Sequence, residues 1–234
     1  MSAPTDVGGG LAGSAASAPG SVRRAPKAHL RRHFQDLDQQ AHAAQLGMWA
    51  FLASEVLFFT GFFTLYAAYR VTFPDVFARA VTYTDLWLGT ANTYVLVIAS
   101  YLVALAVGAI RKDRPKRSSW LLASASGLGV LFLVLKGIEY AHHFREGIYP
   151  GAYYHFDKLH GPGARVFFSL YYLMTGLHAI HVIGGIVVLG VLAWRARRGH
   201  YSSEWNTPIE LGGLYWHFVD IVWLFLWPMF YLMK

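Results

Sequence analysis

Residues 215–227 read Tyr-Trp-His-Phe-Val-Asp-Ile-Val-Trp-Leu-Phe-Leu-Trp, and this stretch decides the fold class. It belongs to an apolar run long enough for a helix to cross a bilayer, which takes about 20 residues. His217 and Asp220 nevertheless lie three residues apart within it. A charged side chain in hydrocarbon costs about 2.5–3.5 kcal/mol on insertion scales, so such residues usually face a bundle interior. The stretch therefore predicts a membrane helix that packs against other helices.

The composition supports a membrane protein and excludes several kinds of site. Of 234 residues, 55% are hydrophobic and 14% are charged, whereas a soluble domain carries about 25% charged residues. Cysteine is absent, which excludes disulfides, thiolate metal sites and cysteine nucleophiles. The formal charge of +7 does not indicate nucleic-acid binding, because the basic residues flank apolar spans, as topology signals do.

The chain divides into a tail and one membrane domain. Residues 1–40 are first rich in Gly, Ala, Ser and Pro and then basic, which predicts a disordered cytoplasmic tail. Residues 41–234 form the predicted domain, an all-α bundle of five transmembrane helices, because lipid-exposed backbone must satisfy its own hydrogen bonds. The five spans are expected at about 46–66, 86–110, 120–140, 166–194 and 211–233.

The basic residues predict the orientation of the bundle. The tail, the loop between the second and third spans and the loop between the fourth and fifth hold 13 of the 20 Lys and Arg residues. Positive charge is retained on the cytoplasmic side. The N-terminus is therefore expected in the cytoplasm and the C-terminus outside. The Gly- and Pro-rich segment 141–165 then forms an irregular cap on the outer side.

Small residues recur at intervals of four in two of the spans. This spacing lets helix backbones approach closely, and we expect it to serve helix packing within this one chain. The residues concerned are Ser100, Ala104 and Gly108 in the second span, and Ala123 with Gly127 and Ala125 with Gly129 in the third.

Seven ionisable residues lie inside the predicted spans and are the candidate functional residues. Six of them form three pairs spaced three residues apart, so each pair shares one helix face. Glu55 is the exception, because no partner adjoins it in sequence. The pairs are Lys136 with Glu139, His178 with His181, and His217 with Asp220.

Several interpretations of these residues compete. The histidines and Asp220 could supply metal ligands, and Glu139-x-x-His142 matches half of a di-iron site. A second Glu-x-x-His copy is missing, so we do not favour a metal site. A proton path through Glu55, Asp220 and the histidines is a further possibility. An interhelical hydrogen-bond network that fixes packing explains most of these residues more simply. A hydrolase and a nucleotide site lack their sequence motifs.

Four blocks of the sequence together resemble subunit III of the haem-copper oxidases. Residues 47–59, Gly-Met-Trp-Ala-Phe-Leu-Ala-Ser-Glu-Val-Leu-Phe-Phe, are similar to a characteristic span of that family. Residues 135–140 resemble its Glu-Tyr element, and residues 175–185 its Gly-x-His-x-x-His-Val-x-x-Gly element. Residues 215–227 resemble its closing signature. The blocks occur in family order.

The resemblance implies a non-catalytic subunit of a terminal respiratory oxidase that reduces oxygen and pumps protons. It places haem and copper in subunits I and II, with neither cofactor nor metal bound by this chain. The expected partners are those two subunits and phospholipid, and no nucleic acid. By motif match, Glu55 faces subunit I and is related to proton uptake and to durability during turnover. The remaining six residues are expected in lipid binding or a structural polar network: Lys136, Glu139, His178, His181, His217 and Asp220.

The chain departs from the family's seven-helix form because the two N-terminal helices of that form are missing. Five-helix members are bacterial, which implies the bacterial inner membrane as the location. The departure also puts in doubt the lipid cleft that those helices help to form. The electron donor, cytochrome c or quinol, binds other subunits, so this chain does not distinguish the two. The alternatives are an accessory subunit of a nitric oxide reductase and an independent ion carrier or metalloenzyme.

Overall fold

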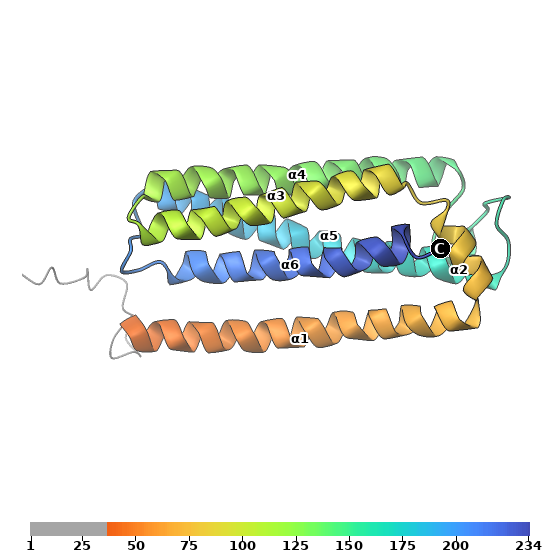
Figure 1. Ribbon diagram of the computed structural model, residues 1–234, viewed down its shortest axis with the longest axis horizontal. Helices are drawn as coiled ribbons and strands as arrows, with labels where there is room; N and C mark the ends of the chain where they lie inside the picture. The colour runs from red at the N-terminus through yellow and green to blue at the C-terminus, as the bar shows by residue number, and fades with distance from the viewer. Residues whose placement is uncertain (1–36) are drawn as a thin grey trace, which may run out of the picture.

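A computed structural model describes residues 37–234, and long helices make up most of this part of the chain (Figure 1). Five of the helices are long and apolar enough to cross a membrane, and no strand occurs among these residues. The predicted all-α bundle with five spans is confirmed for the described range. The predicted disordered tail lies almost wholly outside it. The elements are α1 (Leu37–Thr72), α2 (Pro74–Val81), α3 (Leu86–Arg111), α4 (Pro115–Arg145), a short 3-10 helix η2 (Gly151–Tyr153), α5 (Pro162–Arg197) and α6 (Thr207–Tyr231).

Most of the membrane helices are longer than their hydrophobic spans. Helix α1 begins nine residues before the predicted span 46–66 and ends six residues after it. Helix α5 has 36 residues, about 54 Å at 1.5 Å per residue, whereas the hydrocarbon core is about 30 Å thick. Hydropathy marks only the part that lipid surrounds, and the backbone hydrogen bonds continue beyond it. The helices therefore extend past the hydrocarbon core.

Local sequence signals set several helix ends. The Asp85 carboxylate accepts hydrogen bonds from the backbone N–H groups of Trp87 at 3.0 Å and Leu88 at 3.1 Å, which caps α3. Helices α2, α4, α5 and α6 each carry proline in the first turn, where no backbone N–H is needed. Asp113, with φ 54°, allows the tight turn between α3 and α4.

Helix α2 is an element that hydropathy alone did not predict, because it has only eight residues. Its buried side chains include Phe77, whose ring lies 5.4 Å from that of Tyr66 and 5.2 Å from that of Phe167. Helix α2 thus closes one end of the bundle beside α1 and α5.

The segment between α4 and α5 is the expected irregular cap, with η2 as its only helix. Gly147 and Gly161 adopt φ values of 82° and 110°, which favour glycine. The Tyr154 hydroxyl donates to the Leu159 carbonyl at 2.8 Å. Burial raises the pKa of Tyr154 to about 12, so this phenol stays protonated and keeps the bond.

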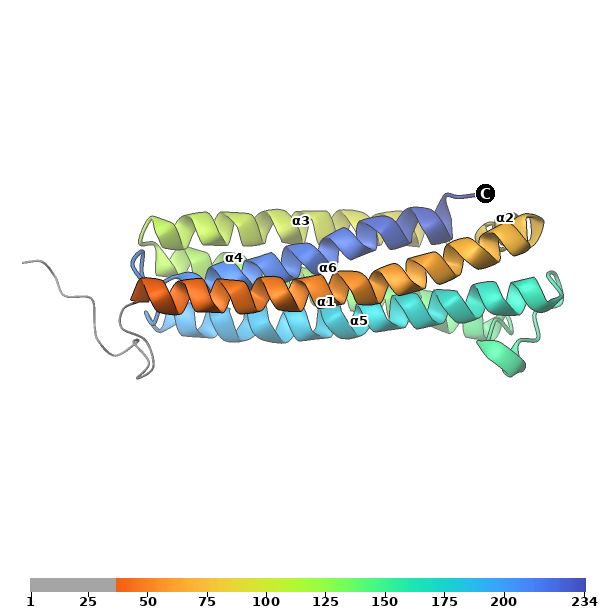
Figure 2. The same cartoon turned by 90° about the horizontal axis from the view of Figure 1, so that it is seen from below.

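Helices α3, α4, α5 and α6 form a four-helix bundle, and α1 lies outside it (Figures 1 and 2). Each bundle helix packs on two neighbours, α3 on α4 and α6, and α5 on α4 and α6. Helix α1 contacts α5, α6 and α2 and runs apart from α3 and α4. Only 11% of the residues in its most apolar stretch are buried, against 56% for α6. Most of the surface of α1 therefore faces lipid or a partner.

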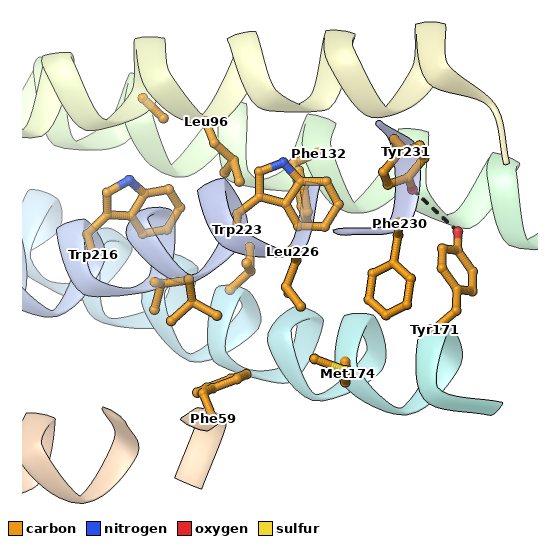
Figure 3. Close-up of a cluster of buried hydrophobic side chains, with 14 of the residues drawn as sticks. Phe59, Leu96, Phe132, Tyr171, Met174, Trp216, Trp223, Leu226, Phe230 and Tyr231 are labelled. Carbon is orange, nitrogen blue, oxygen red and sulfur yellow. Dashed lines mark hydrogen bonds between the residues drawn. The ribbon is translucent and has the colours of Figure 1, made fainter. Parts of the chain in front are cut away.

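The bundle core is built on large aromatic side chains from α6 (Figure 3). Trp216 and Trp223 are both fully buried. A Cβ atom at Gly185 would lie 2.7 Å from the Trp216 ring, and one at Gly129 would lie 2.8 Å from it. The two glycines therefore provide the space that the indole occupies between α4 and α5.

The small residues have two different roles, which corrects part of the expectation that all of them serve helix packing. Ala125 and Gly129 are buried against the neighbouring helices, as predicted. Ala104 and Ala123 are exposed instead. A Cβ atom at Gly108 or Gly127 would meet nothing within 4 Å. At these four positions the helix surface is not covered by another helix of the chain, because the neighbouring helix packs on the opposite face.

Candidate functional site

Glu55 and His181 form an ion-pair contact between α1 and α5. Glu55 Oε2 lies 3.0 Å from His181 Nε2. The two side chains are 20% and 17% exposed, so the pair lies at the edge of the protein and is still reachable from outside. The Phe59 ring, one turn along α1, stands edge-on to the imidazole at 5.3 Å. Glu55, isolated in the sequence, therefore has a partner in the fold.

The His181 ring is held in place from its other side as well. Its Nδ1 lies 2.8 Å from the Leu177 carbonyl, one turn earlier on α5. The Tyr215 hydroxyl donates at 3.0 Å to the backbone carbonyl of His181, which ties α6 to the same turn. The imidazole is thus fixed by α5 and presented to α1.

A second polar cluster lies inside the four-helix bundle, around Lys136 and Glu139. The predicted pairing of these two residues on one face of α4 is present, with Lys136 Nζ 3.1 Å from Glu139 Oε2. The ammonium also donates to the hydroxyls of Tyr171 at 2.9 Å and Tyr231 at 2.6 Å. Both hydroxyls donate in turn to Glu139 Oε1, at 2.7 and 2.6 Å. Every ammonium proton and both carboxylate oxygens are therefore bonded.

This cluster is closed to lipid. Lys136 and Glu139 are 2% and 1% exposed, and the ammonium lies over the Tyr171 ring at 4.6 Å and the Trp223 ring at 5.3 Å. Tyr171 and Tyr231, drawn in Figure 3, belong to α5 and α6. Of the two roles expected for Lys136 and Glu139, this geometry favours the structural network that joins α4, α5 and α6.

His178 lies in a different environment from His181. It is fully buried, with its ring 5.2 Å from the Trp223 ring and 5.7 Å from the Phe132 ring. Neither ring nitrogen has a hydrogen-bond partner within residues 37–234. His178 therefore belongs to the aromatic core, and the shared face that the three-residue spacing predicts does not bring the two histidines into one site.

His217 connects α6 to α3. Its Nδ1 lies 2.6 Å from the Ser100 hydroxyl, and the residue borders an apolar groove between α1 and α6. Asp220, one turn further, is 6% exposed. Its polar neighbour is Ser100, and its oxygens complete no hydrogen bond of good geometry in the described range. His217 and Ser100 thus tie two helices together in the middle of the span.

The candidate metal ligands do not converge. His181 faces Glu55, His217 faces Ser100, and His178 lies among aromatic rings. No three His, Asp or Glu side chains come together anywhere in residues 37–234 to hold a metal ion. Within residues 37–234 the three histidines therefore lie in three separate environments.

Comparison with known proteins identifies the family. A family model described as cytochrome c oxidase subunit III matches residues 33–234. The chain belongs to this family. Among curated relatives, cytochrome c oxidase subunit 3 of Thermostichus vulcanus is 33% identical over 192 residues, which cover 80% of this chain and 86% of the relative. The protein of the same name from Synechocystis sp. is 31% identical over 189 residues, covering 80% and 74%. That of Oncorhynchus mykiss is 32% identical, covering 79% and 67%.

Membership confirms the terminal-oxidase subunit III that the four sequence blocks implied. This subunit III is a component of a terminal respiratory oxidase and works in a complex with other oxidase subunits. With its five membrane-spanning helices, it is a multi-pass protein of the bacterial plasma membrane.

Sequence reasoning missed several residues that this subunit III uses in its polar sites. Tyr171 and Tyr231 complete the cluster around Lys136, and Ser100 bonds His217. A tyrosine or serine in an apolar span carries no charge and gives little sign of a polar role. The buried Lys–Glu pair did give one indication, because such a pair needs additional hydrogen bonds from neighbouring residues to be stable.

Proposed function

We propose that this subunit III packs on the catalytic subunit I through the outward face of α1. Helix α1 is the least buried of the five spans and touches α5 and α6 on one side only. Its exposed side chains include Trp49, Val56 and Leu57. A long helix with one side free is well placed to lie between this bundle and a neighbouring subunit, because the other four spans already satisfy one another.

We propose further that Glu55 supports proton uptake and the durability of the oxidase during turnover. The observation that carries this proposal is the Glu55–His181 contact at 3.0 Å, in which both members are ionisable and partly exposed within a membrane span. Ionisable groups at this depth that pair with each other mark functional sites more often than the surrounding apolar residues do. The contact lies on the helix that is offered to the neighbouring subunit.

The test compares Glu55→Ala with wild type in the assembled oxidase. Initial oxygen reduction stays close to wild type, because the redox centres are expected elsewhere, while proton uptake or the number of turnovers before inactivation falls. Ser54→Ala is the matched control, since within residues 37–234 the Ser54 hydroxyl bonds only the Phe51 carbonyl of its own helix. Unchanged proton uptake and unchanged lifetime in Glu55→Ala would contradict the proposal.

We also propose that haem and copper are held by subunits I and II, and that phospholipid binds this subunit. The scattered positions of its histidines support the first point, and the apolar surface of α1 supports the second. Metal analysis of the separated subunit tests the cofactor proposal, and stoichiometric iron or copper would overturn it. Retention of phospholipid by the purified complex tests the other.

The proposed orientation keeps the N-terminus in the cytoplasm and the C-terminus outside. Both basic turns of the described range, between α3 and α4 and between α5 and α6, lie at the end of the bundle where α1 begins (Figure 1). This grouping agrees with retention of positive charge on the cytoplasmic side. Protease cleavage of the α3–α4 turn only from the cytoplasmic face would support it, and cleavage from the outer face would reverse it.

A further inference from the structure

A small basic hollow lies where α3 leaves its span and α4 begins. Its volume is about 170 Å³, below the roughly 300–1,000 Å³ typical of sites that enclose a whole drug-sized ligand. It is therefore too small to enclose a whole lipid, and the part of a lipid that could lie inside it is limited to the headgroup. The residues that line it are Ala104, Leu105, Gly108, Ala109, Lys112, Arg114 and Arg117.

The three cations at this hollow lack acidic partners. Lys112, Arg114 and Arg117 are exposed and form no ion pair within residues 37–234. The adjacent Arg111, by contrast, is bound to Glu210 at 2.8 Å. Asp113, between Lys112 and Arg114 in the chain, accepts from the backbone N–H of Ser203 at 3.1 Å. Three uncompensated positive charges around one hollow complement an anion.

The floor of the hollow is apolar and runs into the membrane span. Ala104 is exposed and Gly108 has open space where a Cβ would be, so α3 presents a shallow groove on its outer face. The groove belongs to Leu86–Arg111, a helix of membrane-spanning length and composition. A ligand here would meet positive charge at one end and hydrocarbon-compatible surface at the other.

We propose that this hollow binds the headgroup of an anionic phospholipid, with an acyl chain lying over Ala104 and Gly108. Basic pockets between membrane helices at the cytoplasmic side bind anionic lipid headgroups. A free phosphate would use the cations and leave the apolar groove unused. The site deepens the lipid role proposed above and rests on it, and it gives that role a defined place and lipid class.

The first arm of the test removes the charges in the purified oxidase complex. Native mass spectrometry counts bound phosphatidylglycerol during a titration, with phosphatidylcholine as the neutral lipid. Because each basic residue at a lipid headgroup contributes about a fivefold gain in affinity, Lys112→Gln/Arg114→Gln/Arg117→Gln should bind one phosphatidylglycerol roughly 100-fold more weakly. Lys116→Gln is the matched control, since Lys116 is an exposed cation of the same turn and does not line the hollow.

The second arm fills the groove and leaves every charge in place. Gly108→Leu introduces a side chain into open space, so α3 keeps its packing while the path of the acyl chain is blocked. Gly127→Leu is the matched control, because Gly127 on α4 is equally open and lies outside the hollow. The proposal expects Gly108→Leu to weaken phosphatidylglycerol binding and Gly127→Leu to leave it unchanged.

Each result decides between specific interpretations. Loss in both hollow variants, with both controls at wild-type level, supports the site. The site is overturned if a control variant loses as much lipid as the hollow variants do, or if phosphatidylcholine binds as well as phosphatidylglycerol. It is also overturned if inorganic phosphate displaces the lipid from Gly108→Leu as readily as from wild type. Wild-type binding in the hollow variants overturns this site but leaves the general lipid role standing. A wild-type complex that retains no phospholipid of either kind contradicts the lipid role itself.

Discussion

Glu55 and His181 share one proton across the boundary between α1 and α5. The Leu177 carbonyl, 2.8 Å from His181 Nδ1, can only accept, so Nδ1 carries a hydrogen. The 3.0 Å contact between Nε2 and Glu55 Oε2 then needs one further proton. That proton resides either on the imidazole, which gives an ion pair, or on the carboxyl, which gives a neutral pair. The hydrogen bond is kept in both states.

This relationship predicts that Glu55→Gln and Glu55→Ala differ in how firmly the subunit is retained in the purified complex. The glutamine amide can donate to Nε2 and keep α1 attached, but it cannot exchange a proton with the imidazole. Retention of this subunit in the purified complex should therefore stay at wild-type level in Glu55→Gln and fall in Glu55→Ala, by an amount that corresponds to about 1–3 kcal/mol. Proton uptake should be impaired in both. Equal retention of the two variants would show that the hydrogen bond does not hold α1.

The C-terminal end of α1 has a second attachment, which predicts a separate effect on stability. The Tyr66 hydroxyl donates to the Met229 carbonyl at 2.6 Å, and Arg70 donates to the Met233 carbonyl at 2.8 Å. Tyr66→Phe with Arg70→Gln should lower the thermal midpoint of the subunit, since each lost bond is worth roughly 0.5–3 kcal/mol. Tyr69→Phe is the control, because Tyr69 is exposed on the same helix. A midpoint shift of the same size in the control would assign the effect to general loosening of α1.

The sequence predicts contacts within one helix far better than contacts between helices. The contact between Lys136 and Glu139 could be predicted from the sequence because the two residues are three positions apart on α4. Glu55 and His181 are 126 residues apart, and nothing in either span indicates which helices adjoin. The same limit explains His178 and His181. Three helical residues leave an offset of about 60°, which is enough to place one ring in the core and the other at the α1 boundary.

The Lys136–Glu139 and Arg111–Glu210 ion pairs are expected to respond in opposite ways to removal of the cation. Lys136→Met leaves the Glu139 carboxylate buried without its cation, which typically costs about 3–5 kcal/mol. Arg111→Gln removes a cation whose side chain is 62% exposed, and an exposed pair is worth about 0–1 kcal/mol. Thermal unfolding of the purified subunit in its complex should separate the two variants clearly. Adding Glu139→Gln to Lys136→Met should recover part of the loss, since no uncompensated charge then remains. A mild effect of Lys136→Met alone would mean that Tyr171 and Tyr231 suffice to hold the carboxylate.

Enlarging Gly185 is predicted to disturb the core packing around Trp216. A Cβ atom there would lie 2.7 Å from the indole ring, and Trp216 is fully buried, where dense packing opposes displacement of a side chain. Gly185→Ala should therefore destabilise by about 1–3 kcal/mol through overpacking, in spite of the better helix propensity of alanine. Gly176→Ala on the same helix meets nothing within 4 Å, so it should be neutral or stabilising by up to about 1 kcal/mol. Thermal unfolding measures both. Trp216→Phe should relieve Gly185→Ala because the smaller ring vacates the space, and an additive loss in that double variant would refute the steric explanation.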